Sequence, residues 1–82
     1  MRLFKINKTL SAVCDCVSTR SGFKHVATLL YNGREIDTAK ARYQNRTWER
    51  YKYETVLKNL SNSKKLDEKE QKQFKKAIKK FQ

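Results

Sequence analysis

Hydrophobic and polar residues in the first half of the chain follow the patterns of β-strands. Within residues 11–18, apolar side chains occur at both alternating positions, which is typical of a strand covered on part of both faces. Asn32-Gly33 separates residues 23–31 from residues 34–43 and favours a two-residue turn, because both turn positions need a positive φ. The polar residues 18–22 end in glycine and predict the preceding hairpin loop. Together these segments predict a three-stranded antiparallel meander.

The Asn32-Gly33 turn also predicts the register of its hairpin. Closing the turn pairs Tyr31 with Arg34, Leu29 with Ile36, Ala27 with Thr38, His25 with Lys40 and Phe23 with Arg42. In this register Ala39 and Ala41 share a face with Val26 and Leu30, opposite the face of Leu29. Their small side chains would let a helix approach closely.

An amphipathic helix is predicted over residues 48–60, with Thr47 as its N-cap. Its apolar face consists of Tyr53, Val56, Leu57 and Leu60. A strand competes with this interpretation, because the residues around Tyr53 also alternate and are aromatic or β-branched. The strand leaves Val56, Leu57 and Leu60 without a common face, so the helix is favoured.

A second helix is predicted over residues 67–81, after the polar connection 61–65. Asp67 and Glu70 have the spacing of a capping box, and the acidic first turn and basic last turn both suit the helix dipole. Its narrow apolar stripe contains Phe74, Ala77, Ile78 and Phe81, and its remaining surface carries Lys69, Lys72, Lys75, Lys76, Lys79 and Lys80. This stripe must dock on the rest of the protein.

The fold class predicted from these elements is α+β: a meander over residues 11–18, 23–31 and 34–43, followed by two helices. All 82 residues form one small domain, in which residues 66–82 are a basic amphipathic C-terminal segment. Residues 1–9 fit either a short edge strand or an ordered arm.

The amino-terminal residues contain no uninterrupted apolar run, so they predict neither a signal peptide nor a membrane span. A cytoplasmic location follows as an expectation, with Cys14 and Cys16 as reduced thiols.

Zinc binding by Cys14, Cys16 and His25 is not expected, because structural zinc sites generally need four nitrogen or sulfur ligands. A nucleophilic cysteine–histidine pair also lacks a third orienting group. We therefore expect no metal and no cofactor.

The balance of charge changes the expected function. The chain has 20 Lys and Arg against 8 Asp and Glu, a formal net charge of +12. Such a field attracts phosphate polymers, anionic membrane surfaces or acidic proteins. A chain of 82 residues leaves little volume for an enclosed catalytic pocket. The sequence thus favours a binding protein over an enzyme.

Basic residues interleaved with aromatic ones are the strongest functional signal. Basic groups neutralise phosphates, and exposed rings stack on unpaired bases. The residues predicted to contact nucleic acid are Arg20, Lys24, Lys40, Arg42, Arg46, Trp48 and Arg50. Alternatively, the rings belong to the core and the charges form a solvated face.

The lysine-rich last helix has three interpretations: a contact to nucleic acid, a contact to an anionic membrane, or a solvated face that aids solubility. Its narrow apolar stripe without Trp disfavours the membrane.

The run GFKHVATLLYNGREIDTAKARYQNRTWERYKYETVL, residues 22–57, resembles small proteins of phages and mobile elements of Gram-positive bacteria that share an NRTWE-like core. The resemblance covers under half of the chain and transfers no functional residue. It implies a phage or prophage source in a bacterial host, and hence DNA transactions or host takeover.

The order strand, Asn-Gly turn, strand, helix is also similar to double-stranded RNA-binding domains, but Arg46–Arg50 replaces their Lys-Lys-x-x-Ala-Lys segment. The arm-type DNA-binding domains of phage integrases are a comparably loose match.

The function expected from the sequence is non-enzymatic nucleic-acid binding through phosphate contacts of a basic sheet and its loops. One alternative is a protein-binding inhibitor or modulator of a host enzyme, whose basic face docks on an acidic surface. A small structural dimer is a third interpretation.

Overall fold

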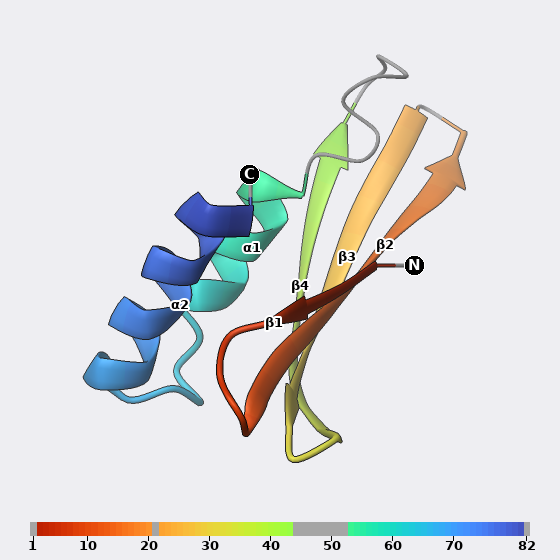
Figure 1. Cartoon of the computed structure of the whole chain (residues 1–82). Helices are drawn as coiled ribbons and strands as arrows, with labels where there is room; N and C mark the ends of the chain where they lie inside the picture. Colours follow the sequence, from red (N-terminus) through yellow and green to blue (C-terminus); the bar gives the residue numbers. More distant parts are fainter. Residues whose placement is uncertain (1, 21, 44–52, 82) are drawn as a thin grey trace.

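Two layers make up the part of the chain that the computed structural model describes, residues 2–20, 22–43 and 53–81. One layer is an antiparallel sheet in the order β1-β2-β3-β4, and the other is a pair of helices on one face of that sheet (Figure 1). The elements are β1 (Arg2–Lys5), β2 (Leu10–Thr19), β3 (Gly22–Tyr31), β4 (Arg34–Tyr43), α1 (Glu54–Ser61) and α2 (Glu68–Phe81). The predicted α+β class, with a sheet followed by two helices, is confirmed.

The sheet has four strands, so the predicted count of three is wrong. The additional strand is β1, an edge strand antiparallel to β2, which decides between the two alternatives for the amino terminus. Phe4 holds it in place: this buried ring lies opposite Ala12 and packs on Phe74 of α2, with 5.9 Å between ring centroids. A buried contact with a distant helix thus adds to the pairing with β2 in holding a strand whose own sequence pattern is weak.

The turn between β1 and β2 is closed by one side chain. The Asn7 Oδ1 atom accepts hydrogen bonds from the backbone N–H groups of Thr9 and Leu10, both at 2.8 Å. This local bonding is the physical reason that asparagine is common in turns. The turn returns the chain to β2 at Leu10, just before the predicted start of that strand.

The hairpin between β2 and β3 is tighter than the predicted loop over residues 18–22. β2 continues to Thr19, and β3 begins at Gly22. The Thr19 hydroxyl donates to the Gly22 carbonyl oxygen at 3.1 Å, and Gly22 adopts a φ of 141°, which glycine tolerates best. The strands thus extend further than the polar sequence suggested.

The Asn32-Gly33 turn is confirmed, since both residues have positive φ, 52° and 81°. The register predicted from it holds only for the pair Tyr31 and Arg34. A bulge between Leu29 and Leu30 shifts the ladder, so that Leu29 lies opposite Asp37 and not Ile36. The remaining pairs are displaced with it. A bulge inserts one residue into one strand, here β4. The local sequence does not predict it.

The bulge moves two small residues of β4 to the other face. Ala39 lies opposite Ala27, and Ala41 lies opposite His25, so the prediction that they share a face with Val26 is wrong. The expectation that Ala39 and Ala41 lie beneath a helix is nevertheless confirmed, because both pack against the core that α1 covers. The core consists of Phe4, Leu10, Ala12, Cys14, Ala27, Leu29, Tyr53, Val56, Leu57, Leu60, Leu66, Phe74 and Ile78.

The first helix begins later than predicted. α1 starts at Glu54 rather than residue 48, and its N-cap position is Tyr53, which makes no side-chain capping bond. The predicted cap Thr47 lies outside the described residues. The predicted apolar face is confirmed, since Tyr53, Val56, Leu57 and Leu60 are all buried. Periodicity thus identified the buried face but not the helix boundary.

The second helix follows its sequence signals closely. The Asp67 backbone N–H donates to Glu70 Oε1 at 3.1 Å, and the Glu70 backbone N–H donates to Asp67 Oδ1 at 2.7 Å. These reciprocal bonds form the predicted capping box, and α2 runs from Glu68. Phe74 and Ile78 of the predicted stripe are buried in the core.

Ser63 fixes the connection between the helices to the sheet. Its buried hydroxyl donates to Asp37 Oδ2 of β4 and accepts from the Lys65 backbone N–H at 3.1 Å. Its carbonyl oxygen accepts from the Gln71 side chain at 3.0 Å. Hydrogen bonds from the Ser63 hydroxyl and the Thr38 backbone N–H hold the pKa of Asp37 below its usual value. A segment that looked like a simple polar linker is thus a tertiary anchor.

We predict that Ser63→Ala lowers the free energy of unfolding by about 1–2 kcal/mol at neutral pH. A hydrogen bond to a charged group usually contributes about 1.5–3 kcal/mol, and the lower value is expected because solvent reaches the partly exposed Asp37. The pKa of Asp37 is lower in the folded chain, so this stabilisation is complete above the unfolded value of about 3.9 and disappears as the pH falls through the folded value. Urea unfolding at neutral and acidic pH measures the difference. In an Asp37→Ala background, Ser63→Ala should lower the free energy of unfolding by less. An equal loss in both backgrounds would contradict the stabilising hydrogen bond between Ser63 and Asp37.

We predict that Phe74→Ala lowers the free energy of unfolding by about 3–5 kcal/mol, because it removes a fully buried ring that links α2 to β1. For a domain of this size that is a large part of the total stability. Thermal unfolding monitored by circular dichroism provides the measurement. Lys72→Ala, at an exposed position of the same helix, is the control and should change stability by less than about 0.5 kcal/mol. Similar losses in both variants would refute the role of Phe74.

Candidate functional site

One face of the sheet is not covered by either described helix. Residues paired across antiparallel strands point to the same face, so the register defines the side chains of this surface, which we call the open face. Its members are Leu3, Lys5, Ser11, Val13, Asp15, Val17, Lys24, Val26, Thr28, Leu30, Glu35, Thr38, Lys40 and Arg42. Its middle is apolar and its rim is charged.

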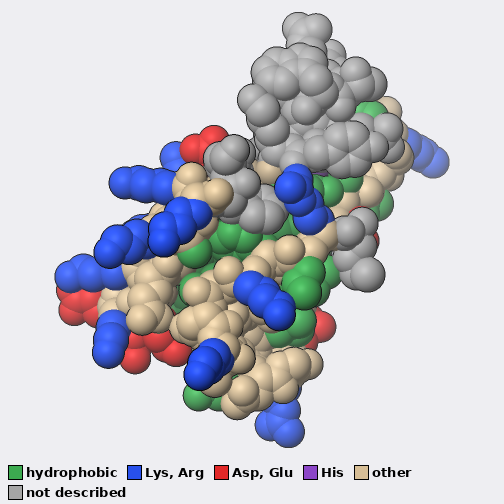
Figure 2. Space-filling view, viewed as in Figure 1, with side chains coloured by type: hydrophobic (Ala, Val, Ile, Leu, Met, Phe, Trp, Pro, Cys, Tyr) green, Lys and Arg blue, Asp and Glu red, His purple; other side chains and the backbone are tan. Residues whose placement is uncertain are grey.

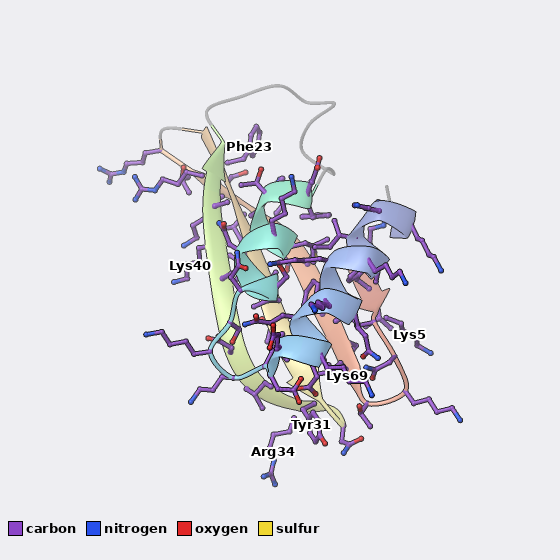
Figure 3. The ribbon with its side chains drawn as sticks, turned by 90° about the vertical axis from the view of Figure 1, so that its left-hand side faces the viewer. Lys5, Phe23, Tyr31, Arg34, Lys40 and Lys69 are labelled. Atoms are coloured by element: carbon purple, nitrogen blue, oxygen red, sulfur yellow. The ribbon has the colours of Figure 1, made fainter. Side chains whose placement is uncertain are left out.

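Three of the residues predicted to contact nucleic acid come together on the open face. Lys24 of β3 lies directly opposite Arg42 of β4, and Lys40 follows on β4 opposite Val26. Arg20 lies at the same end of the sheet, in the turn between β2 and β3. In Figure 3, Lys40 projects from β4 away from the helices. The predicted contacts Arg46, Trp48 and Arg50 lie outside the described residues.

These cations are available to a ligand. Arg20, Lys40 and Arg42 are exposed, and Lys24 is half-buried. Within residues 2–20, 22–43 and 53–81, none of these cations is ion-paired, whereas Lys58 forms an i,i+4 pair with Glu54 at 3.3 Å. An anion that binds at this end of the sheet would therefore not have to displace a carboxylate of the described chain.

The predicted interleaving with aromatic rings is not found on the described open face. Phe23 precedes Lys24 in the sequence, but consecutive strand residues point to opposite faces, and Phe23 lies on the side of His25. The described residues of the open face contain only aliphatic and polar side chains. Leu3 and Val17 are its most exposed apolar members, at 56% and 45%.

A second basic surface follows α2. Lys69, Lys72, Lys75, Lys76, Lys79 and Lys80 are all exposed. Lysine and arginine side chains project along the side of the molecule that the helices form (Figure 2). The sequence predicts that these lysines lie outside the apolar stripe and leaves their role open, but only the docked position of α2 shows that Lys76 and Lys80 flank β1. Helical periodicity alone could not have located this neighbour.

The cysteine and histidine side chains lie on the helix-covered side of the sheet. His25 is fully buried and its ring lies 4.7 Å from that of Tyr53, between centroids. Cys14 is buried, which raises the pKa of its thiol to about 11 in spite of the nearby Arg2. Because the thiolate is the reactive form, this thiol is a poor nucleophile. Cys14 and Cys16 form no disulfide.

The described residues contain neither a cluster of potential metal ligands nor a helix suited to crossing a membrane. In the part that the structure covers, His, Cys, Asp and Glu side chains do not gather in groups of three or more that could hold a metal ion. Of the helices formed by the described residues, none has the length and apolar character needed to cross a membrane.

Comparison with protein-family models, with curated proteins and with solved structures yielded no match to this chain. The resemblance of residues 22–57 to phage proteins therefore stays a prediction.

Proposed function

We propose that this protein is a non-enzymatic nucleic-acid-binding protein that contacts phosphates through the β3–β4 end of the open face. The observation that carries the proposal is the cross-strand pair of Lys24 and Arg42, with Lys40 in the next row of the same face. Arg20 in the adjoining turn extends this basic end.

The sheet suits the binding of an extended polyanion. Side chains paired across antiparallel strands lie roughly 5 Å apart at their Cβ atoms, so the backbone ladder fixes the spacing of the cations. Because the backbone already positions these side chains, less conformational entropy is lost when a ligand binds. Each phosphate neutralised also releases a counterion. The net charge of +12 adds a long-range attraction, to which the lysines of α2 contribute.

The acidic residues of the open face make its two ends differ in charge. Glu35 lies opposite Leu30, close to the Asn32-Gly33 turn and remote from the pair of Lys24 and Arg42. Asp15 lies nearer, in the row of Val26 and Lys40, and lowers the net positive charge of that row without pairing with any of these cations. A polyanion is therefore expected at the end near Arg20. With no described ring on this face, phosphate contacts dominate, and Trp48 remains the predicted base-stacking residue.

A protein partner is the second candidate, because the open face also exposes apolar side chains. The half-buried Val13, Val26 and Leu30 lie on the central strands β2 and β3, and the exposed Leu3 and Val17 lie toward the margins of the face. An apolar centre with a polar rim is the usual anatomy of protein interfaces. An inhibitor or modulator of a host enzyme, as the predicted phage setting suggests, would use this surface.

We predict that the log of the binding constant for nucleic acid falls with log salt at a slope near −5, as expected for about six phosphate contacts. Replacing Lys24 and Arg42 together with Ala should make the slope shallower by about 2, because two contacts are lost. Fluorescence anisotropy with labelled duplex DNA, single-stranded DNA and RNA over a salt series measures both effects.

The matched control is Lys64→Ala with Lys65→Ala, which removes the same charge from exposed positions in the connection between the helices. A slope that changes equally in both double variants would show that only the net charge matters. Binding that does not depend on salt would refute phosphate contact altogether and leave the protein partner as the better explanation.

A further inference from the structure

A groove of about 470 Å³ runs between the edge strand β1 and α2. Leu3, Lys5 and Ile6 line it on the side of the sheet, and Gln73, Lys76 and Lys80 line it on the side of the helix. The helix residues lie at i, i+3 and i+7, on a face of α2 next to the buried Phe74. In Figure 3, the labelled Lys5 of the edge strand β1 lies next to α2, which agrees with their shared lining of the groove.

The backbone of β1 presents unpaired hydrogen-bonding groups along its outer edge. The Ile6 N–H donates to the Leu10 carbonyl oxygen at 3.0 Å, and the same register pairs Phe4 with Ala12. In an antiparallel pair, residues alternate between bonding to the partner strand and pointing away from it. The N–H and C=O groups of Leu3 and Lys5 therefore point away from β2, and no described residue bonds to them.

The other edge of the sheet is less suited to pairing. β4 contains the irregularity opposite Leu29 and Leu30, whereas the four residue pairs of β1 and β2 are in regular register. Bulges are one of the features that discourage pairing at the edges of natural sheets. β1 is thus the edge that can accept another strand.

The charge and polarity of the groove indicate what the added strand contains. Lys5, Lys76 and Lys80 are exposed around it, and no carboxylate is among its described lining residues. Leu3 is 56% exposed, and Ala77 supplies a small apolar contact on the helix side. A strand that fits therefore alternates acidic with apolar side chains.

We propose that the groove between β1 and α2 binds an extended acidic segment of a partner protein, which pairs with β1 as an additional strand of the sheet. Its backbone bonds to Leu3 and Lys5, and its carboxylates contact Lys76 and Lys80. A peptide can satisfy the alternating N–H and C=O groups of an edge. A nucleic-acid backbone offers mostly acceptors and would oppose the carbonyl oxygens. This site is separate from the basic end of the open face.

The first test uses a short labelled peptide of alternating Val and Glu residues, with fluorescence anisotropy as the readout. Leu3→Pro removes the outward N–H, and proline is tolerated at an edge where that group faces solvent. Leu3→Ala removes the side chain but keeps the donor. We expect Leu3→Pro to weaken peptide binding at least about threefold beyond Leu3→Ala, the effect of one net hydrogen bond. Equal binding by both variants would overturn strand pairing.

Two peptide controls isolate the chemistry of the ligand. Replacing Glu with Lys should abolish binding, because the groove is basic. N-methylation of alternate amides keeps the charge but prevents pairing along one edge, and should also abolish binding. If the methylated peptide binds as well as the parent peptide, the lysines attract the peptide without an added strand, and the proposal fails.

Charge reversal tests the helix side of the groove. Lys76→Glu with Lys80→Glu should weaken binding of the acidic peptide at least about tenfold, since two attractive contacts become repulsive. Lys69→Glu with Lys72→Glu makes the same charge change on α2 outside this groove and should have a smaller effect. Equal losses in both variants would show attraction by net charge alone.

Amide hydrogen exchange gives the direct readout in the intact protein. Bound peptide should slow the exchange of the Leu3 and Lys5 amides, which have no partner in the described chain, and leave those of Lys24 and Arg42 unchanged. Slowed exchange on β4 with none on β1 would overturn the assignment to this edge. Displacement of the peptide by duplex DNA, together with unchanged exchange at Leu3 and Lys5, would identify the groove as a polyanion site.

Discussion

The bulge in the ladder between β3 and β4 decides what each face of this sheet can do. It places Ala39 opposite Ala27 and Ala41 opposite His25, so that small side chains lie beneath α1 and the helix can pack closely. The same shift places Arg42 opposite Lys24 on the other face. Without the extra residue, the alternation of β4 would be inverted. Its alanines would face outward and its cations would face the core, where an unpaired charge is costly.

That division accounts for the chemistry of the two faces. The helix-covered face contains the residues most often associated with catalysis or metal binding, yet His25 packs beside Tyr53, and the Cys14 thiol is kept protonated by burial. Their surroundings are those of a core. The open face carries the cations in positions fixed by the backbone. Among the described residues, His25 and Cys14 thus serve the packing of the core.

The two helices and their connection contact both edge strands of the sheet. Phe74 contacts Phe4 and so orders β1, while Ser63 joins the preceding connection to Asp37 of β4. The helices are thus attached at both outer strands. One result is a groove beside β1 that is distinct from the basic end of the open face. The two surfaces differ in mechanism, since the open face offers cations at fixed positions and the groove adds the hydrogen-bonding edge of a strand.

The sequence by itself determined the features that depend on neighbouring residues: the turn at Asn32-Gly33, the capping box of Asp67 and Glu70, and the buried stripe of each helix. Turns, caps and amphipathic faces are set by bonds and spacings within a few residues, and the net charge that predicted a binding protein is a property of composition. Only the tertiary structure decided the β4 register, the start of α1 and the strand β1, because these depend on contacts between distant segments, such as Phe4 with Phe74. For the candidate site, the sequence named Lys24, Lys40 and Arg42, but the ladder alone could show that they share a face and that Phe23 does not.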